Sequence, residues 1–318
     1  MMRHRFLAFL FLPLLAVMAG AVAEDGSTAS FLRITPMARP AAMGNAYTGL
    51  AEGIESLGFN PAGLVTIERW DAGLAQIVRP MGARFSHVAA ARRFSPKTVG
   101  ALQLSYFGID DDYRNAAGVV TGTFSNYDLS PALSVAHQMT PEIAVGGTVR
   151  IISSELAGYT ASTMAADFGL KYTPIRIPSV SLGFSLQNIG PGLTYDQTSS
   201  PLPWIARVGG AWRPSQGRYV LASDFSVDQD GQPRLHLGSE VKIAEGFSLR
   251  GGFDLGNDVE LKDALKLGAG FRSTVGSFDY AYESIGEMGN VHRFSYSYLG
   301  GLGLHRGPSE KERFFSEA

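Results

Sequence analysis

The sequence predicts an all-β protein, a transmembrane antiparallel β-barrel of about 14 strands with an N-terminal plug segment. Three observations predict it. The chain opens with an export signal, and its composition combines 38 Gly, 19 Phe, 12 Tyr and 3 Trp with only 18% charged residues. Most of the chain alternates apolar and polar residues with a period of two, which is the pattern of strands that separate an apolar phase from a polar one.

Residues 1–23 read as a cleaved signal peptide. Arg3 and Arg5 form a positive start, residues 6–18 are an apolar run, and Ala21-Val22-Ala23 is a small-x-small cleavage site. The run is short for a membrane-spanning helix. The alternative is a buried N-terminal helix. Export through a cleaved signal is the interpretation that the basic start and the cleavage site favour.

Residues 24–69 are expected to form a plug or hatch segment. They are less regular than the rest, with a stretch rich in small residues at 37–44 and a second motif at 58–64. A barrel of about fourteen strands is too wide for its wall side chains alone to fill. A segment of small and apolar residues ahead of the first strand is therefore predicted to occupy the lumen.

Residues 70–301 are expected to form the barrel. Leu235, Leu237 and Val241 fall on one face of a strand, while His236 and Glu240 fall on the other. Most predicted strands run about 9–12 residues, the length that a tilted strand needs to cross a bilayer. Their ranges are 70–79, 84–93, 98–108, 124–137, 142–156, 164–173, 178–189, 204–213, 217–227, 233–243, 247–255, 264–273, 276–284 and 291–300.

The alternative fold is a soluble all-β periplasmic protein, such as a sandwich or propeller. Soluble strands are usually shorter, with a mode of about five or six residues. Isolated charges in mid-strand also suit a wet barrel lumen better than a dry sandwich core. These charges are Arg207, Asp224, Arg250, Lys266 and Asp279.

Catalytic and metal chemistry is not readable in this sequence. There is no cysteine, and the six histidines (4, 87, 137, 236, 292 and 305) form no metal-binding motif. The run at 110–112 is interpreted as a loop tip between the third and fourth strands, and Asp228-Gln229-Asp230-Gly231 as a hairpin turn. His137 and His292 have serines nearby, as a serine hydrolase requires, but such a coincidence is common. We therefore expect no enzyme, no cofactor and no metal, and the net charge of −2 argues against a nucleic-acid partner.

The C-terminus combines an aromatic strand with a polar extension. Phe294, Tyr296 and Tyr298 alternate in the last predicted strand and are expected to serve as the insertion signal. Residues 302–318, with Glu310-Lys311-Glu312-Arg313, are expected to form a polar C-terminal tail.

Several motifs carry a family resemblance. The stretch Ala41-Ala42-Met43-Gly44-Asn45-Ala46-Tyr47, then Asn60-Pro61-Ala62-Gly63-Leu64, Leu186-Gln187-Asn188-Ile189-Gly190-Pro191-Gly192 and Phe278-Asp279-Tyr280-Ala281-Tyr282 occur in this order. In this they resemble the PorV/PorQ family of outer-membrane proteins, which is similar to the FadL-type long-chain fatty-acid transporters. The resemblance implies a fourteen-stranded outer-membrane barrel. It also implies that Asn60, Pro61 and Ala62 belong to the plug or hatch, although an ordinary helix-start turn explains these residues equally well.

The expected function is transport of small hydrophobic or amphipathic molecules through a plugged barrel. The alternative is a PorV-like barrel component of a secretion system that binds exported proteins at the cell surface, and a purely structural barrel is a third. Expected partners are outer-membrane lipid together with a hydrophobic small-molecule ligand or exported proteins. A ligand receptor is expected to show an apolar groove near residues 107–113 and 193–204.

Overall fold

The computed structural model describes residues 28–300 apart from residues 157, 196, 215, 216 and 258. The predicted signal peptide and polar tail therefore lie outside the described residues. No helix in the described part of the chain is both long and apolar enough to cross a membrane.

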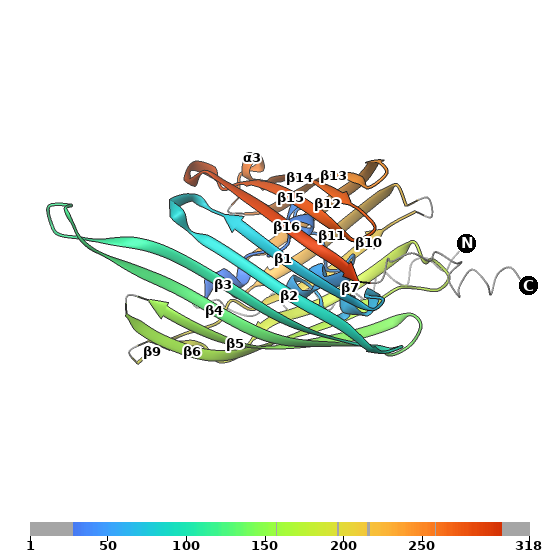
Figure 1. The fold of residues 1–318 in the computed structure, drawn as a ribbon, viewed down its shortest axis with the longest axis horizontal. Coiled ribbons are helices and arrows are strands. Elements are labelled where there is room, and N and C mark those ends of the chain that lie inside the picture. Colours follow the sequence, from blue (N-terminus) through green and yellow to red (C-terminus); the bar gives the residue numbers. More distant parts are fainter. Residues whose placement is uncertain (1–27, 157, 196, 215–216, 258, 301–318) are drawn as a thin grey trace, which may run out of the picture.

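Fourteen of the described strands form a closed antiparallel barrel, which confirms the predicted fold class (Figure 1). Each strand pairs with its neighbour along the chain, and pairing of the first with the last, from Trp70↔Gly300 to Val78↔His292, closes the barrel. The strands are β1 (Trp70–Val78), β2 (Arg84–Ser95), β3 (Thr98–Arg114), β4 (Val120–Gln138), β5 (Ile143–Leu156), β6 (Tyr159–Tyr172), β7 (Val180–Ile189), β10 (Ile205–Trp212), β11 (Tyr219–Asp228), β12 (Pro233–Ala244), β13 (Phe247–Gly256), β14 (Leu265–Arg272), β15 (Gly276–Ser284) and β16 (Asn290–Gly300).

The two ends of the barrel differ. The turn rim, where β1 begins and β16 ends, carries connections such as 96–97 and 245–246. The loop rim, at the opposite end, carries η4 (Pro80–Gly82), α3 (Leu261–Ala264), η5 (Gly286–Met288) and the small sheet of β8 (Leu193–Tyr195) and β9 (Thr198–Ser200). Short turns at one end and longer loops at the other are typical of outer-membrane barrels.

The three aspartates at 110–112 were predicted to form a loop tip, and this prediction is wrong. They lie in β3, which continues through Arg114 and pairs with β4 along this stretch, as in Asp110↔Ser125. The Ser125 hydroxyl donates to the Asp110 carboxylate at 2.7 Å. Ladder hydrogen bonds and cross-strand contacts here override the weak strand propensity of aspartate. The resulting hairpin of β3 and β4 reaches well beyond the other strands (Figure 1).

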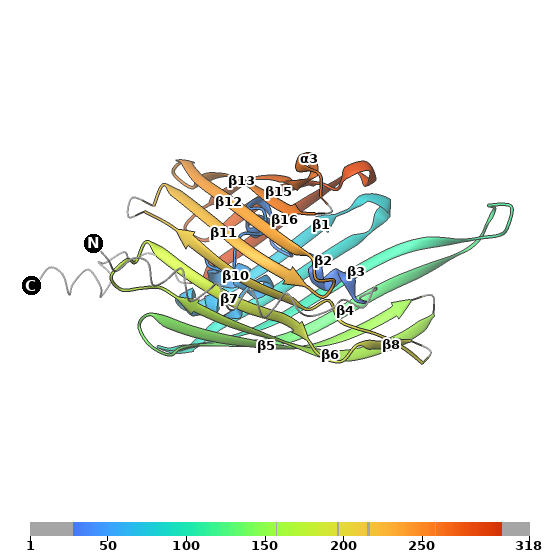
Figure 2. The ribbon, with the colours of Figure 1, turned by 180° about the vertical axis from the view of Figure 1, so that it is seen from behind.

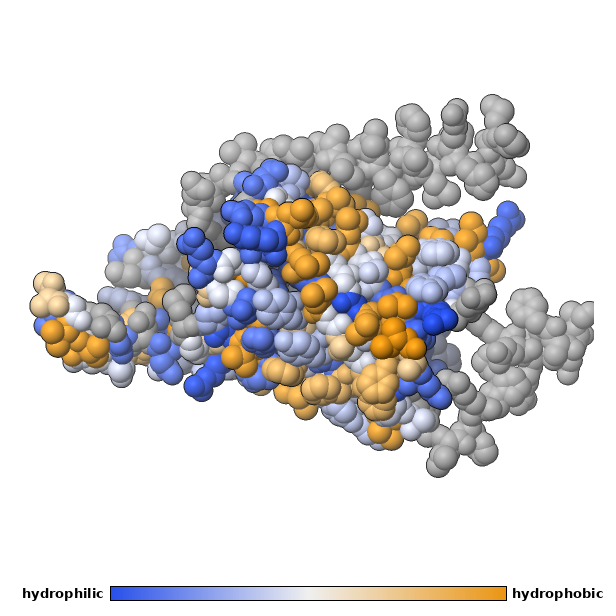
Figure 3. All heavy atoms as spheres, turned by 90° about the horizontal axis from the view of Figure 1, so that it is seen from above, coloured by the Kyte–Doolittle hydropathy of each residue, from blue (hydrophilic) through white to orange (hydrophobic). Residues whose placement is uncertain are grey.

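The outer face of the wall is apolar. Large hydrophobic side chains at alternate positions are exposed on it, among them Leu74, Leu133 and Leu249. Phe294 and Tyr298 are exposed on the same face of β16, and Tyr296 between them is half-buried. In the view from above, hydrophobic side chains recur along the visible wall (Figure 3). The insertion role of the three aromatics stays a prediction.

Residues 28–69, here called the inner segment, lie between the walls of the barrel (Figure 1 and Figure 2). Their helical elements are η1 (Ser30–Arg33), α2 (Ala38–Ala42), η2 (Gly53–Gly58) and η3 (Pro61–Thr66). The segment starts at the loop rim, where the Thr28 amide donates to the Pro201 carbonyl at 3.0 Å. It ends towards the turn rim, where Arg93 Nε donates to the Ile67 carbonyl at 2.8 Å.

Candidate functional site

Inward-facing glycines let the inner segment lie directly against the wall. A Cβ atom added at Gly146 of β5 would lie 2.5 Å from the carbonyl carbon of Pro61, and one at Gly183 of β7 would lie 2.6 Å from that of Thr48. Further around the barrel, Gly238 of β12 and Gly252 of β13 face the backbone of Met43 in the same way. Only glycine leaves room for such an approach of two backbones. The wall is therefore shaped to the segment it encloses.

Asn60 both starts a helical turn and attaches the inner segment to the wall. Its Oδ1 accepts from the Ala62 amide at 3.1 Å, which caps η3, and Pro61 occupies the first position of that turn. Its Nδ2 donates to the Thr48 carbonyl at 3.1 Å and to the Leu170 carbonyl of β6 at 2.9 Å. Asn60, Pro61 and Ala62 are all buried. A hatch role for them stays a prediction.

Arg39 is the centre of a buried charge network. Its Nε donates to Glu240 of β12 at 2.7 Å, and its Nη1 donates to Glu52 at 2.6 Å and lies 3.3 Å from Glu55. Glu240 also accepts from Arg250 Nε at 2.6 Å. The network therefore joins the inner segment to β12 and β13, which come much later in the sequence. A guanidinium surrounded by carboxylates in this way is strongly held.

The charged residues in mid-strand do not line a water-filled lumen, as the sequence suggested, but are mostly buried. Asp224 accepts from the Tyr47 and Thr48 amides at 2.8 and 2.6 Å. Arg250 pairs with Asp279, and Lys266 pairs with Asp254. Asp224, Arg250, Lys266 and Asp279 are all buried, and the inner segment supplies the amide partners of Asp224. Arg207 lies with its guanidinium carbon 5.3 Å from the ring centre of Phe59.

Two glutamates of the inner segment have opposite electrostatic surroundings. Burial raises the pKa of Glu52, but Arg39 and Arg213 outweigh that effect and lower the pKa to about 2. For Glu55, burial dominates over Arg39 and raises the pKa above its ordinary value. Glu52 therefore remains a carboxylate under all ordinary conditions.

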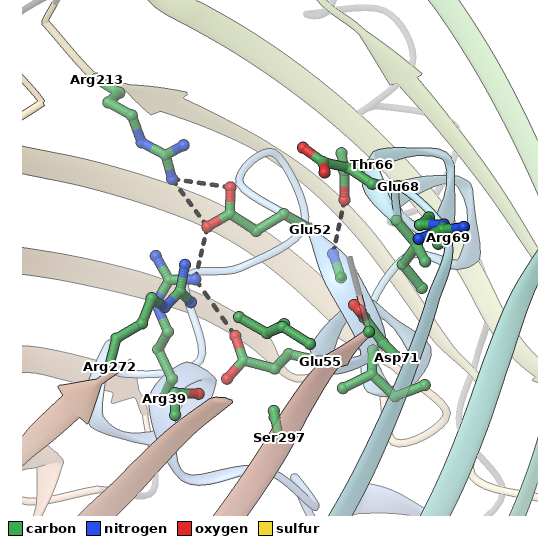
Figure 4. Close-up of a pocket in the computed structure, with 16 residues that line it drawn as sticks. Arg39, Glu52, Glu55, Thr66, Glu68, Arg69, Asp71, Arg213, Arg272 and Ser297 are labelled. Atoms are coloured by element: carbon green, nitrogen blue, oxygen red, sulfur yellow. Dashed lines mark hydrogen bonds and ion pairs between the residues drawn. The ribbon is translucent and has the colours of Figure 1, made fainter. Parts of the chain in front are cut away.

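A cavity of about 270 Å³ opens at the turn rim (Figure 4). The inner segment and strands from both ends of the sequence line it, so no motif in the sequence points to it. The lining contains both acidic and basic side chains, and its apolar side chains are mainly those of isoleucine and leucine. The lining residues are Arg39, Glu52, Gly53, Ile54, Glu55, Thr66, Ile67, Glu68, Arg69, Asp71, Arg213, Arg272, Ser277, Ser297, Leu299 and Gly300.

An apolar cluster lies at the loop rim. Phe31 of the inner segment packs there with Leu193 and Leu202, all three buried. Phe107 and Tyr195 pack against the cluster and are only partly buried. The two ranges that were expected to form an apolar groove thus meet over the start of the inner segment.

His137 and His292, the two histidines with serines nearby in the sequence, do not lie in one site. His137 Nδ1 lies 2.9 Å from the Thr98 hydroxyl, and His292 lies beside Tyr280. A third, His87, lies 2.9 Å from the Ser105 hydroxyl inside the barrel. Among the residues that the structure describes, no group of three or more His, Cys, Asp or Glu side chains is placed to hold a metal ion.

Comparison with known proteins found matches only among solved structures. No family model and no curated protein matches the chain. The toluene transporter TbuX of Ralstonia pickettii superposes with a TM-score of 0.59 at 14% identity, covering 82% of this chain and 96% of TbuX. The toluene transporter TodX of Pseudomonas putida gives 0.58 at 12% identity, covering 81% and 95%.

A FadL homologue of Pseudomonas aeruginosa gives a TM-score of 0.56 at 11% identity, covering 88% of this chain and all of that one (100%). At these identities the likeness concerns the fold. This chain therefore folds as a closed fourteen-stranded barrel of the FadL type.

Proposed function

We propose that this chain is an outer-membrane β-barrel that admits small hydrophobic or amphipathic molecules, with the inner segment as its plug. The outward-facing apolar side chains support a membrane location, because such a wall is costly to expose to water. In a closed barrel every backbone group of the wall is paired, as a bilayer requires. The loop rim then faces the outside of the cell.

The apolar cluster at the loop rim is the observation that carries the transport proposal. A rim exposed to water has little reason to collect partly buried aromatic side chains unless an apolar molecule binds there. Phe107 and Tyr195 are far apart in the sequence, and both pack against the cluster that contains Phe31. Proteins of the same fold include two named as toluene transporters, which agrees with an apolar cargo.

The inner segment is suited to keep such a barrel closed to water and ions. It crosses the lumen, it is seated on glycines, and it is tied to the wall by Arg39 and Asn60. The finer assignment to the PorV/PorQ family rests on sequence motifs alone. The protein-secretion role that this resemblance implies has no comparable support in the arrangement of the described residues.

Uptake by whole Gram-negative cells tests the proposal. Cells that express the chain are expected to take up labelled toluene or a medium-chain fatty acid several-fold faster than cells that lack it. Phe107→Asp should remove most of that gain, because it places a charge in the apolar cluster. Phe278→Ala is the matched control, since Phe278 is an exposed aromatic on the outer wall. Unchanged uptake by cells with folded, membrane-inserted protein would refute the transport proposal.

A further inference from the structure

The cavity at the turn rim collects buried acceptor atoms that have no partner. The hydroxyls of Ser277 and Ser297 and the Oε1 atom of Glu55 are buried there without a hydrogen-bond partner among the described residues. Asp71 of β1, only 7% exposed, lines the same cavity with its carboxylate. A buried polar group without a partner costs free energy, so several around one cavity make it a candidate binding site for a ligand that pairs with them.

These atoms define the chemistry of that ligand. Carboxylate oxygens only accept hydrogen bonds, and a serine hydroxyl can accept as well as donate. A primary ammonium carries one positive charge and three N–H donors, which matches two carboxylates and the neighbouring hydroxyls. The four groups come from different elements, with Glu55 on η2, Asp71 on β1, Ser277 on β15 and Ser297 on β16. Figure 4 shows Glu55, Asp71 and Ser297 around the cavity.

The remaining walls favour an organic cation over a metal ion. Ile54, Ile67 and Leu299 also line the cavity, and its volume of about 270 Å³ is far larger than a single ion needs. The guanidinium of Arg39 stands beside Glu55, and it would repel a divalent ion about twice as strongly as a singly charged ammonium at the same distance. Glu52 and Glu240 offset the charge of Arg39 only in part, because they also pair with Arg213 and Arg250. Arg272 also lines the cavity and attracts Asp71 and Glu55, but its side chain is exposed, so water screens part of that attraction.

We propose that this cavity is a binding site for a small primary ammonium carried on a short apolar group, with Asp71 as the principal counter-ion. Glu55 Oε1 and the hydroxyls of Ser277 and Ser297 accept the remaining N–H groups. The apolar group lies against Ile54, Ile67 and Leu299. The site is at the opposite rim from the apolar cluster, and it stands whether or not the barrel transports hydrophobic cargo.

Calorimetric titration of the full-length protein in a non-ionic detergent tests this site first without any variant. Benzylammonium is the probe, with benzyl alcohol as its neutral analogue, benzoate as an anion and calcium as a metal ion. Benzylammonium is expected to bind at least about tenfold more tightly than benzyl alcohol, because one charged hydrogen bond corresponds to roughly that factor. Equal binding of the alcohol or benzoate, or displacement of benzylammonium by calcium, would overturn the proposal.

Variants then locate the site. Asp71→Asn keeps the shape of the side chain and is expected to weaken benzylammonium binding about ten- to hundredfold, with a smaller loss for Ser297→Ala. Glu68→Gln is the matched control, because Glu68 lines the same cavity but is exposed. Slower migration of boiled than unboiled samples on gels verifies that each barrel is folded. If Asp71→Asn binds like the unaltered protein, Asp71 is not the counter-ion.

Discussion

At Gly146 the wall of the barrel carries no side chain because the inner segment already fills that place. Gly146→Ala would bring a methyl group to 2.5 Å from the carbonyl carbon of Pro61. We expect it to destabilise the folded barrel by about 1–3 kcal/mol, as overpacking does. Gly147→Ala is the matched control, because its methyl group would meet only the Asp167 carbonyl oxygen, at 3.7 Å. Urea unfolding in lipid vesicles measures both, and equal effects would show that the glycine contact is unimportant.

Glu52 makes the attachment of the inner segment sensitive to acid. Its pKa is about 2 in the folded protein and near 4.5 in an unfolded chain, so its ion pairs with Arg39 and Arg213 stabilise the fold above pH 4.5. That stabilisation, at most about 3 kcal/mol, is lost as the pH falls from 4.5 through 2. Glu52→Gln should remove this part of the pH dependence. Unfolding measured at pH 7 and at pH 3 tests it, and an unchanged pH dependence in the variant would contradict it.

A single strand such as β1 tests whether the outer wall meets lipid. Leu74 is at its middle and Val78 is at its end, and both side chains are about half exposed on the same face (52% and 51%). Leu74→Arg should cost about 2–4 kcal/mol in vesicles and Val78→Arg only about 0–1, because the cost of a charge falls from the bilayer centre to its surface. Similar costs at the two sites, measured by urea unfolding, would place this face in water.

The strands were predictable because each one carries its own evidence. In β12, Leu235 and Leu237 face outward and His236 faces inward, as their alternation predicts. The extension of β3 past Asp110 was missed because it depends on pairing with β4 rather than on local propensity. The contacts of Glu240 with Arg39 and of Asp224 with Tyr47 were beyond prediction as well. They join residues 201 and 177 positions apart in the sequence, and no local pattern encodes such a contact.

At the scale of the whole molecule, the barrel wall does not depend on the inner segment for its backbone hydrogen bonds. The wall is closed by its own hydrogen bonds, from β1 through to β16, and the inner segment contributes no strand to it. If residues 31–66 were removed, Asp224, Arg250 and Glu240 would lose their cover and face water in a wide lumen, which charged groups tolerate. The barrel without its inner segment is therefore expected to fold.

Such a variant should act as an open pore. We expect its conductance in planar bilayers to exceed that of the full chain by at least about tenfold, because fourteen strands enclose a lumen that wall side chains alone do not fill. Removal of residues 302–318 is the control, since it leaves the described barrel and inner segment complete. If the variant without residues 31–66 folds and inserts but conducts no more than the full chain, the inner segment is not what closes the barrel. The plug role would then pass to the loops of the loop rim.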